Sequence, residues 1–392
     1  MSLAAGYPMI AIPGPSPLPE RVLRAAHRVS PDIYGTDLAE MNVRVMGQLK
    51  RLAGTEAHLA PYIGNGHSAW EASAANMFHR GDHALVITSG HFGRSWAEQV
   101  SQMGVIVETL DCGSLPPDPG VLAERLAVDH DHVIKAVMVC QTDTASACMA
   151  DIPALRDAMG DHPALLVVDA IASLGCAPLM MDDWGVDVLI SASQKGLMCP
   201  PGAAFVWFSD KAAMRGRTDL TTPYWDWHLR ANASPDALWR YWGGTPPVQL
   251  IFALDEALRM ILDEEGLIAT WARHAALARA VWAAGDAWGV GDTGIRLSVA
   301  DPGARAASVT AMKLPGAEAL RAWTAEQCGV TLGVGLGAED PANALRVGHM
   351  GHCNAAMILG VLGAMQAGMV ALDIPHGPGA LDAAARVIAE PA

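Results

Sequence analysis

Positive charge is scarce in this sequence. The 392 residues include 26 Lys and Arg against 41 Asp and Glu, which leaves a formal net charge of −15 at pH 7. Nucleic acids and anionic membrane surfaces bind proteins through basic patches, so this balance disfavours both as partners. Charged residues of either sign make up only 17% of the chain, whereas hydrophobic residues make up 51%. That composition argues against disorder and predicts a large buried core.

Paired cysteines are missing as well. The seven cysteines form no CxxC motif, and the N-terminal segment lacks the basic and apolar regions of a secretory signal. We therefore expect reduced thiols and a cytoplasmic location. No apolar run is long enough to predict a membrane span. The nearest approach, residues 355–372, contains Gly and Gln at intervals, so we expect a buried core helix there.

Motifs for metal binding and for nucleotide hydrolysis are also absent. His67, His83 and His91 show neither HExxH nor Cys/His spacing, so we expect no metal site. No GxxxxGK[ST] motif occurs, which disfavours hydrolysis of ATP or GTP.

The chain does contain a regular alternation of short apolar segments and helical segments. This pattern is typical of an α/β fold with a mostly parallel sheet flanked by helices on both faces. In such sheets, ligands bind at the carboxyl ends of the strands. The predicted strands cover residues 83–88, 104–111, 134–141, 164–170, 186–193 and 203–209.

The rest of the chain follows other patterns. The Pro-rich stretch IPGPSPLPE predicts an extended arm without regular structure. The Trp-rich residues 224–247 have no clean period and predict a long structured loop. From about residue 265 the pattern becomes helix, strands and helix, which predicts a smaller α+β domain. The predicted division is an N-terminal arm (1–20), a large domain (21–264) and a small C-terminal domain (265–392).

Two charged residues stand at the ends of predicted strands. Asp169 ends LLVVD, and Lys195 ends VLISASQK. Neighbouring parallel strands would bring both side chains to one edge of the sheet. A buried ammonium group is costly, so Lys195 needs an explanation. Taken alone, the two residues would be explained well enough by a structural ion pair.

Further features are predicted to gather at the same edge. Gly64 and Gly66 precede a helical segment, and the N–H groups of a helix start bind phosphate. Phe92 follows another strand, where its flat ring could stack, and QTDTASA supplies hydroxyls after a third. Each feature alone is also typical of ordinary turns and cores. Together with a carboxylate and a lysine, they indicate a site for pyridoxal 5′-phosphate.

The sequence resembles the class V, fold-type I aminotransferases that use pyridoxal phosphate, in particular the alanine/serine–glyoxylate group. The resemblance covers nearly the whole chain, and its most specific part is the order VVDA, SQKG, PPG. It implies a large domain that binds the cofactor, a smaller C-terminal domain, and a homodimer with shared active sites. The segments that carry it are PGPSPLPE, GNGHSAWEA, SGHFG, VVDAIASLG, WGVDVLISASQKGLMCPPG, GGTPPV and LRVGHMG.

The resemblance assigns the catalytic roles to the two residues at strand ends. Lys195 matches the lysine that forms a Schiff base with the cofactor and, once freed, removes the Cα proton of the substrate. This requires a pKa well below the ordinary lysine value of about 10.4. Asp169 matches the carboxylate that pairs with the protonated pyridine nitrogen, which makes the ring a better electron sink.

The resemblance also implies a set of phosphate ligands. Gly66, His67 and Gln194 match phosphate-binding positions of the family. Thr245 matches a further phosphate ligand that comes from the partner subunit. Trp242 stands where relatives carry a phosphate-binding Tyr, so its indole N–H is the expected donor there.

Other positions match contacts to the cofactor ring and to the substrate. Phe92 takes the ring-stacking position, and Thr144 matches a hydroxyl near the 3-oxygen of the ring. Arg346 matches the arginine that grips the substrate α-carboxylate through two parallel hydrogen bonds. Asn65 is expected to contact the substrate as well. Residues 33–42 depart from the family pattern near the substrate, so the resemblance does not identify the substrate pair.

The sequence thus predicts a cytoplasmic, homodimeric aminotransferase that works by a ping-pong mechanism. It would move an amino group from an amino donor to a small 2-oxo acid, glyoxylate or pyruvate. Three alternatives stay open at this point. The first is an enzyme of the pyridoxamine–pyruvate type; the second is a lyase or desulfurase, for which Cys353 is the suggestive thiol. The third is an α/β scaffold protein in which Lys195 and Asp169 form only an ion pair.

Overall fold

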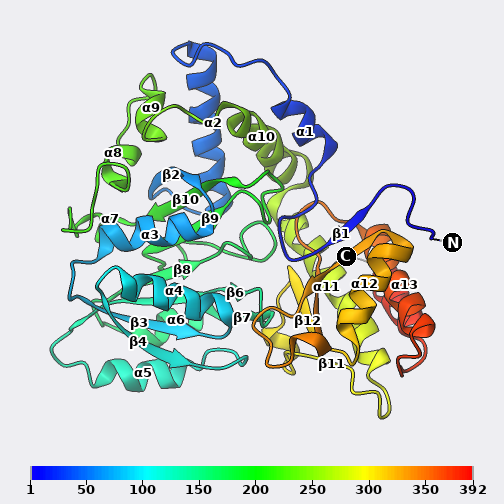
Figure 1. Cartoon of the computed structure of the whole chain (residues 1–392). Helices are drawn as coiled ribbons and strands as arrows, with labels where there is room; N and C mark the ends of the chain where they lie inside the picture. The colour runs from blue at the N-terminus through cyan, green and yellow to red at the C-terminus, as the bar shows by residue number, and fades with distance from the viewer. Residues whose placement is uncertain (1, 391–392) are drawn as a thin grey trace.

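A seven-stranded sheet forms the centre of the computed structural model, which describes residues 2–390 (Figure 1). Its strands are β2 (His58–Gly64), β3 (His83–Thr88), β4 (Ile106–Asp111), β5 (Ile134–Cys140), β8 (Leu165–Asp169), β9 (Val188–Ala192) and β10 (Gly202–Phe208). They lie in the order β2-β10-β9-β8-β5-β3-β4. Only β10 pairs antiparallel, with β2 on one side and β9 on the other. The mostly parallel sheet predicted from the sequence is confirmed.

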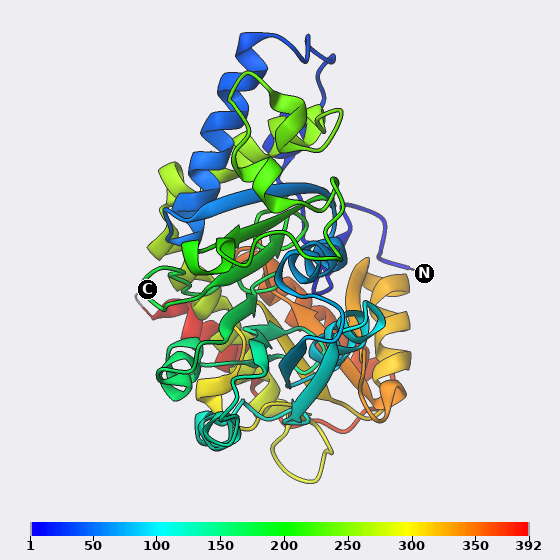
Figure 2. The same cartoon turned by 90° about the vertical axis from the view of Figure 1, so that its left-hand side faces the viewer.

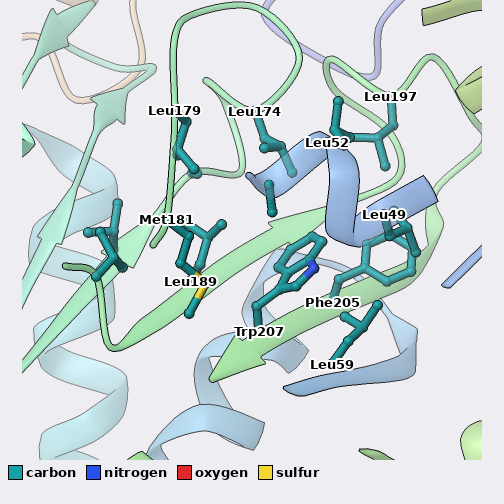
Figure 3. Packing of buried hydrophobic residues seen from close by; sticks show 14 of the residues in the cluster. Leu49, Leu52, Leu59, Leu174, Leu179, Met181, Leu189, Leu197, Phe205 and Trp207 are labelled. Carbon is teal, nitrogen blue, oxygen red and sulfur yellow. The ribbon is translucent and has the colours of Figure 1, made fainter. Parts of the chain in front are cut away.

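Helices cover both faces of this sheet, because alternate strand residues point to opposite sides. In β10, Trp207 belongs to one buried cluster and Val206 to the other. Figure 3 shows Leu49 and Leu52 from a covering helix beside Trp207. The first face carries α1 (Glu20–Ala26), α2 (Thr36–Ala53), α5 (Pro119–Ala127), α6 (Ile152–Met159) and α10 (Val248–Arg259). The second carries α3 (Gly66–Met77), α4 (His91–Gln102) and α8 (Trp227–Ala231).

A second sheet of five strands is built mainly from the C-terminal part of the chain. Its order is β1-β13-β14-β12-β11, with β1 (Met9–Ala11), β11 (Arg296–Leu297), β12 (Val309–Lys313), β13 (Val330–Val334) and β14 (Ala344–Gly348). The accompanying helices are α11 (Leu267–Trp288), α12 (Ala317–Cys328), α13 (Ala355–Ala371) and α14 (Ala380–Ala389). The predicted C-terminal α+β region is confirmed, and α13 is the core helix expected over 355–372. The exact domain boundaries stay a prediction.

The N-terminal arm joins the two sheets. Its strand β1 pairs in parallel with β13, opposite Val330 to Leu332, so it belongs to the small sheet. Residues 12–19 then have no helix or strand, as the Pro-rich sequence predicts. The backbone N–H of Ser16 donates to the carbonyl of Gln194 at 3.0 Å. The arm therefore reaches from the small sheet to the turn that follows β9.

The Trp-rich segment is more regular than predicted. It contains α8 and a further short helix, α9 (Leu238–Tyr241), so the prediction of a loop throughout 224–247 is wrong. Figures 1 and 2 both show this segment beside α2, at the end of the molecule away from the small sheet. Within residues 2–390, no helix combines the length and apolar character that crossing a membrane requires.

Candidate active site

A cavity of about 240 Å³ lies at the carboxyl edge of the large sheet. Its walls come from the turns that follow β2, β3, β5, β8 and β9, and from Gly14 and Pro15 of the arm. A larger cleft of about 730 Å³ lies between α4 and the small sheet, but neither Lys195 nor Asp169 lines it. The predicted site residues that line the smaller cavity are Asn65, Gly66, His67, Phe92, Thr144, Asp169, Gln194 and Lys195. The structure thus brings these residues together around one space.

Lys195 projects from the turn after β9 and is covered by the N-terminal arm. Its Nζ donates to the carbonyl oxygen of Pro13 at 2.5 Å, and its own carbonyl accepts from Ser16 Oγ at 2.7 Å. Burial lowers the pKa of Lys195 to about 8, with the positive charge of Arg346 acting in the same direction and Asp169 opposing it. A lysine in this state gives up its proton near neutral pH, as a general base must.

Asp169 ends β8 with its carboxylate buried. Oδ1 accepts from the backbone N–H of Ile171 at 2.7 Å, and Oδ2 accepts from Trp70 Nε1 at 2.8 Å. Burial raises the pKa of Asp169 to about 6, although both of these hydrogen bonds pull it down. The ionised form of Asp169 is therefore only weakly favoured at neutral pH, and a cationic partner would stabilise it.

The structure does not support the alternative of a plain ion pair. Among residues 2–390, no ion pair joins Lys195 to Asp169, although both line the same cavity. The ammonium group contacts a neutral carbonyl, and the carboxylate contacts neutral N–H donors. Neither buried charge makes a direct ion pair, which is the arrangement expected where a charged ligand binds between them.

The predicted phosphate turn is the N-terminus of α3. Asn65 caps this helix, since its Oδ1 accepts from the backbone N–H of His67 at 3.1 Å. Gly66 follows as the first helical residue, and the start of a helix favours an anion. Across the cavity, Gln194 Oε1 and Thr142 Oγ1 are buried and have no hydrogen-bond partner within residues 2–390.

These residues fit pyridoxal phosphate. A phosphate suits the start of α3, a pyridinium nitrogen suits Asp169, and a carbonyl carbon suits Lys195. Gln194 Oε1 and Thr142 Oγ1 have no partner within residues 2–390, so both atoms are free to bind a polar ligand in the cavity. Asn65, by contrast, uses its carbonyl oxygen to cap α3, and its contact with substrate stays a prediction.

Phe92 and Thr144 face the cavity from the start of α4 and from a neighbouring loop. Phe92 is half-buried in the first turn of α4, and Thr144 lies between the two-residue strands β6 (Thr142–Asp143) and β7 (Cys148–Met149). Asp143 joins the two loops, because its Oδ2 accepts from the backbone N–H of Gly93 at 3.0 Å. This hydrogen bond fixes the start of α4, which carries Phe92, relative to the loop that carries Thr144.

Arg346 lies in β14 at the border of the cavity rather than on its wall. Its Nη1 donates to the carbonyl of Thr144 at 2.9 Å, and its Nε donates to the carbonyl of Val334 at 2.7 Å. The residue is 7% exposed, burial lowers its pKa to about 10, and no carboxylate pairs with it among residues 2–390. A structural ion pair, the alternative explanation for this arginine, is therefore not observed.

Two predicted phosphate ligands lie outside the cavity. Trp242 is fully buried in the main core, and its Nε1 donates to Asn42 Oδ1 of α2 at 3.0 Å. Its only donor is thus used inside the core, so we withdraw its assignment as a cofactor contact. Thr245 is exposed and away from the cavity of its own chain, which leaves the predicted contact across a dimer untested.

The sequence reasoning missed Trp70, Thr142 and Gly14, all of which line the cavity. Trp70 lies one helical turn after Gly66, a spacing that places both on the same side of α3. Gly14 has φ +96°, and a Cβ atom there would lie 2.5 Å from Lys195 Nζ, so another residue at this position would strain the backbone and displace the end of the lysine side chain. Thr142 carried no signal beyond its place in the hydroxyl-rich loop.

Cys353 does not behave as a catalytic nucleophile. It lies before the N-cap of α13, outside the cavity, and is 8% exposed. Burial raises the pKa of its thiol to about 11, so the reactive thiolate is disfavoured at neutral pH. Nearby His349 is structural, with its Nε2 2.9 Å from Thr310 Oγ1. The desulfurase alternative loses its candidate residue.

Comparison with known proteins places these features in a family. The model of the family "Aminotransferase class-V" matches residues 12–321. The chain is 33% identical over 387 residues to a serine–glyoxylate aminotransferase of Methylorubrum extorquens, covering 95% of this chain and 94% of that protein. It is also 33% identical over 387 residues to an L-aspartate–glyoxylate aminotransferase of Paracoccus denitrificans, with 96% and 95% covered. Its structure resembles the pyridoxamine–pyruvate aminotransferase of Mesorhizobium loti with a TM-score of 0.87 and 25% identity over 99% of both chains.

Proposed function

The chain belongs to the class-V aminotransferase family, and from that premise we propose that it uses pyridoxal phosphate to transfer an amino group to glyoxylate or pyruvate. The observation that carries this proposal is the cavity in which Lys195, Asp169 and the start of α3 converge. An aldehyde, a pyridinium and a phosphate each have a complementary group there.

When bound, the cofactor would supply an aldehyde that condenses with amines and a ring that accepts the electron pair of a C–H bond. Lys195 would hold it and then carry protons, with Nζ taking the proton from Cα of the donor. Its pKa of about 8 supports this role, because about a tenth of such a lysine is neutral at pH 7, far more than of an ordinary lysine with a pKa of about 10.4. Asp169 would keep the ring nitrogen protonated.

Arg346 would bind the α-carboxylate of each substrate. Its guanidinium is buried and already anchored by Thr144 and Val334, so it cannot swing away from the cavity without breaking two hydrogen bonds. The uncompensated charge favours an anion of the size of a carboxylate. Anchoring would also fix the orientation of the bound substrate.

Arg346→Lys is expected to lower kcat/KM for an amino acid donor roughly 10- to 100-fold, the effect of losing one charge-assisted hydrogen bond of about 1.5–3 kcal/mol. Lysine keeps the charge but lacks the planar fork. The dissociation constant of the cofactor should barely change, because Arg346 does not line the cavity. Stopped flow measures the rate of each half-reaction, and a fluorescence titration measures the dissociation constant of the cofactor. Rates equal to wild type in both halves would contradict the assignment.

The donor and the acceptor are to be identified with a matrix of amino donors against glyoxylate, pyruvate and 2-oxoglutarate. The two sequence relatives named above, from Methylorubrum extorquens and Paracoccus denitrificans, differ in their donor but share glyoxylate as acceptor, whereas the structural relative is named for pyruvate. We expect product from glyoxylate or pyruvate and little from 2-oxoglutarate. Release of ammonia or sulfide without amino transfer would instead indicate a lyase.

A second candidate is transfer from pyridoxamine to pyruvate. The fold match to the Mesorhizobium loti enzyme over 99% of both chains favours it. In that case the vitamin itself is the donor, so Arg346 would matter only for the half-reaction of the oxo acid. Measuring Arg346→Lys in the two half-reactions separately therefore distinguishes this candidate from the first.

We further propose that the active unit is a homodimer. A cavity of about 870 Å³ on the Trp-rich segment has an apolar wall that includes Trp239 and Leu229, which are 49% and 54% exposed. Such faces are typical of subunit interfaces. Thr245 is exposed a few residues beyond, and could reach the phosphate of the neighbouring subunit. A second copy of the chain is thus the proposed occupant.

Trp239→Asp is expected to shift the protein from dimer to monomer in sedimentation velocity and to weaken cofactor retention. A carboxylate in the centre of an apolar interface would lose its water, which is costly. Val370→Asp is the matched control, because Val370 is a 63% exposed residue of α13, which lies with the small sheet, away from α8 and α9 (Figure 1). A wild-type monomer that is active with bound cofactor would refute the dimer.

The cytoplasmic location stays a prediction. It rests on the seven cysteines, all of which are free thiols in the structure.

A further inference from the structure

Trp70 lies on the wall of the active-site cavity, and its ring is fixed on several sides. The side chain is 1% exposed, and its Nε1 donates to Asp169 Oδ2 at 2.8 Å. Its ring stacks on Trp96, with centroids 5.7 Å apart and planes 18° apart, and the His67 ring lies 4.6 Å away. This packing fixes the orientation of the indole ring, so that its N–H points toward the Asp169 carboxylate.

The Asp169 carboxylate needs such a donor, because its surroundings otherwise favour the protonated form. Burial is the largest influence on its pKa, and the negative charge of Asp143 adds to it. The backbone N–H of Ile171 and the indole of Trp70 are the donors that oppose them. The other titratable groups that face Asp169 are Cys140 on β5, Asp143 after β5, His67 on α3 and Lys195 after β9.

Cys140 gives little help. Its Sγ lies 3.7 Å from Asp169 Oδ2, and its pKa is raised well above the usual thiol value by burial and by Asp169 itself. It therefore stays a neutral and weak donor. Removing the indole N–H would leave Oδ2 with that weak donor alone.

Resting on the proposed use of pyridoxal phosphate, we propose that Trp70 is a positioning residue that keeps Asp169 ionised and fixed in orientation toward the cofactor ring. A carboxylate has about four lone-pair sites. Ile171 donates to Oδ1, whereas Trp70 and the weak Cys140 thiol donate to Oδ2, so a site remains on Oδ1 for a pyridinium N–H. Trp70 thus acts on the cofactor only through Asp169.

Trp70→Phe tests this role, because phenylalanine keeps a six-membered aromatic ring in the stack and removes the pyrrole ring with its N–H donor. The dissociation constant for pyridoxal phosphate, measured by fluorescence titration, is expected to rise roughly 10- to 100-fold. Loss of the donor raises the pKa of Asp169, so the carboxylate takes up a proton at higher pH. The acid limb of the absorbance titration of the bound cofactor should therefore move upward by about one to two pH units.

Trp96→Phe is the matched control. Trp96 is fully buried in the same stack, but its Nε1 has no hydrogen-bond partner within residues 2–390. The control removes the same part of an indole without removing a hydrogen bond to Asp169. We expect its cofactor affinity and its acid limb to stay close to those of wild type, even where its thermal stability falls.

The outcomes separate this inference from the function on which it rests. Wild type that does not bind pyridoxal phosphate would overturn the proposed function and the role of Trp70 with it. Wild type that binds, with an unchanged Trp70→Phe variant or with equal shifts in the Trp70→Phe and Trp96→Phe variants, would overturn only the role of Trp70.

A spectroscopic measurement tests the inference without Trp70→Phe, in case that variant does not fold. In wild-type holoenzyme with ¹⁵N-labelled indoles, one of the twelve tryptophan N–H resonances should lie downfield, because it donates to a carboxylate. In Asp169→Asn, whose amide oxygen is a weaker acceptor, that resonance should move upfield further than any other. Indole resonances that all keep their positions would overturn the inference.

Discussion

Replacing Lys195 with alanine is expected to lower the rate of amino transfer by at least about 10²- to 10⁴-fold, the usual contribution of a general base. The variant also loses the amine that would hold the cofactor, so the effect should exceed that of any other single substitution considered for this chain. The reason lies in the geometry, since Lys195 is the lysine on the cavity wall. Steady-state kcat with the best donor measures the loss.

A chemical label gives an independent measurement. Borohydride reduction of wild type with pyridoxal phosphate, followed by peptide mapping, should place the pyridoxyl group on Lys195 and should label nothing in Lys195→Ala. Lys313→Ala is the control, because Lys313 is an exposed lysine at the end of β12 and should keep both activity and label. A label on another lysine would refute the scheme. The other lysines are Lys50, Lys135, Lys211 and Lys313.

Most strands of the large sheet could be predicted because they are buried on both faces. Such strands appear in the sequence as short runs of apolar residues, and the predicted strand 83–88 coincides with β3. β2 escaped prediction because Pro61 lies in its middle. Proline removes a ladder hydrogen bond, and the structure accommodates it because β2 is an edge strand, with Pro61 opposite Phe205. Edge position depends on the assembled sheet and leaves no local mark.

β1 could not be predicted for a related reason. Its three residues, Met9–Ala11, gain strand geometry only by pairing with β13 near the other end of the chain. The same distant pairing explains how the arm comes to lie over Lys195, where Pro13 accepts the ammonium hydrogen bond. Local sequence indicates that the arm is irregular, but its destination is set by tertiary contacts.

The site could be predicted as far as backbone position determines it. Strand ends meet at one edge of a parallel sheet, so the convergence of Lys195 and Asp169 follows from topology alone. Side-chain direction does not follow. Trp242 matches a family position, yet its indole points into the core and bonds to Asn42. For Trp70 the error is the reverse. The sequence suggests an ordinary core residue on a helix, but in the structure its indole N–H donates to Asp169 in the cavity.

Asp169→Asn is expected to lower kcat by about 10²- to 10⁴-fold, which corresponds to the 3–5 kcal/mol typical of breaking a buried charge pair. The amide has nearly the same shape as the carboxylate, so the fold should be retained. The cofactor should bind at least as weakly as in Trp70→Phe, so kcat is measured with saturating pyridoxal phosphate. The amide cannot hold a proton on the ring nitrogen, however, since it brings no negative charge. The ring then becomes a poor electron sink, and proton removal by Lys195 slows even though its amine is unchanged.

The pH dependence provides the sharper measurement. In wild type, activity should fall at low pH as Asp169 takes up a proton. The pKa of Asp169 is about 6 in the free protein, and a bound pyridinium will lower it. Asp169→Asn has no such group to titrate, so its low residual rate should lose this acid limb. Asp183→Asn, at an exposed carboxylate, is the control and should match wild type throughout. Near-normal turnover in Asp169→Asn would show that the electron sink is not set by this residue, and that the buried carboxylate between Trp70 and Ile171 is only structural.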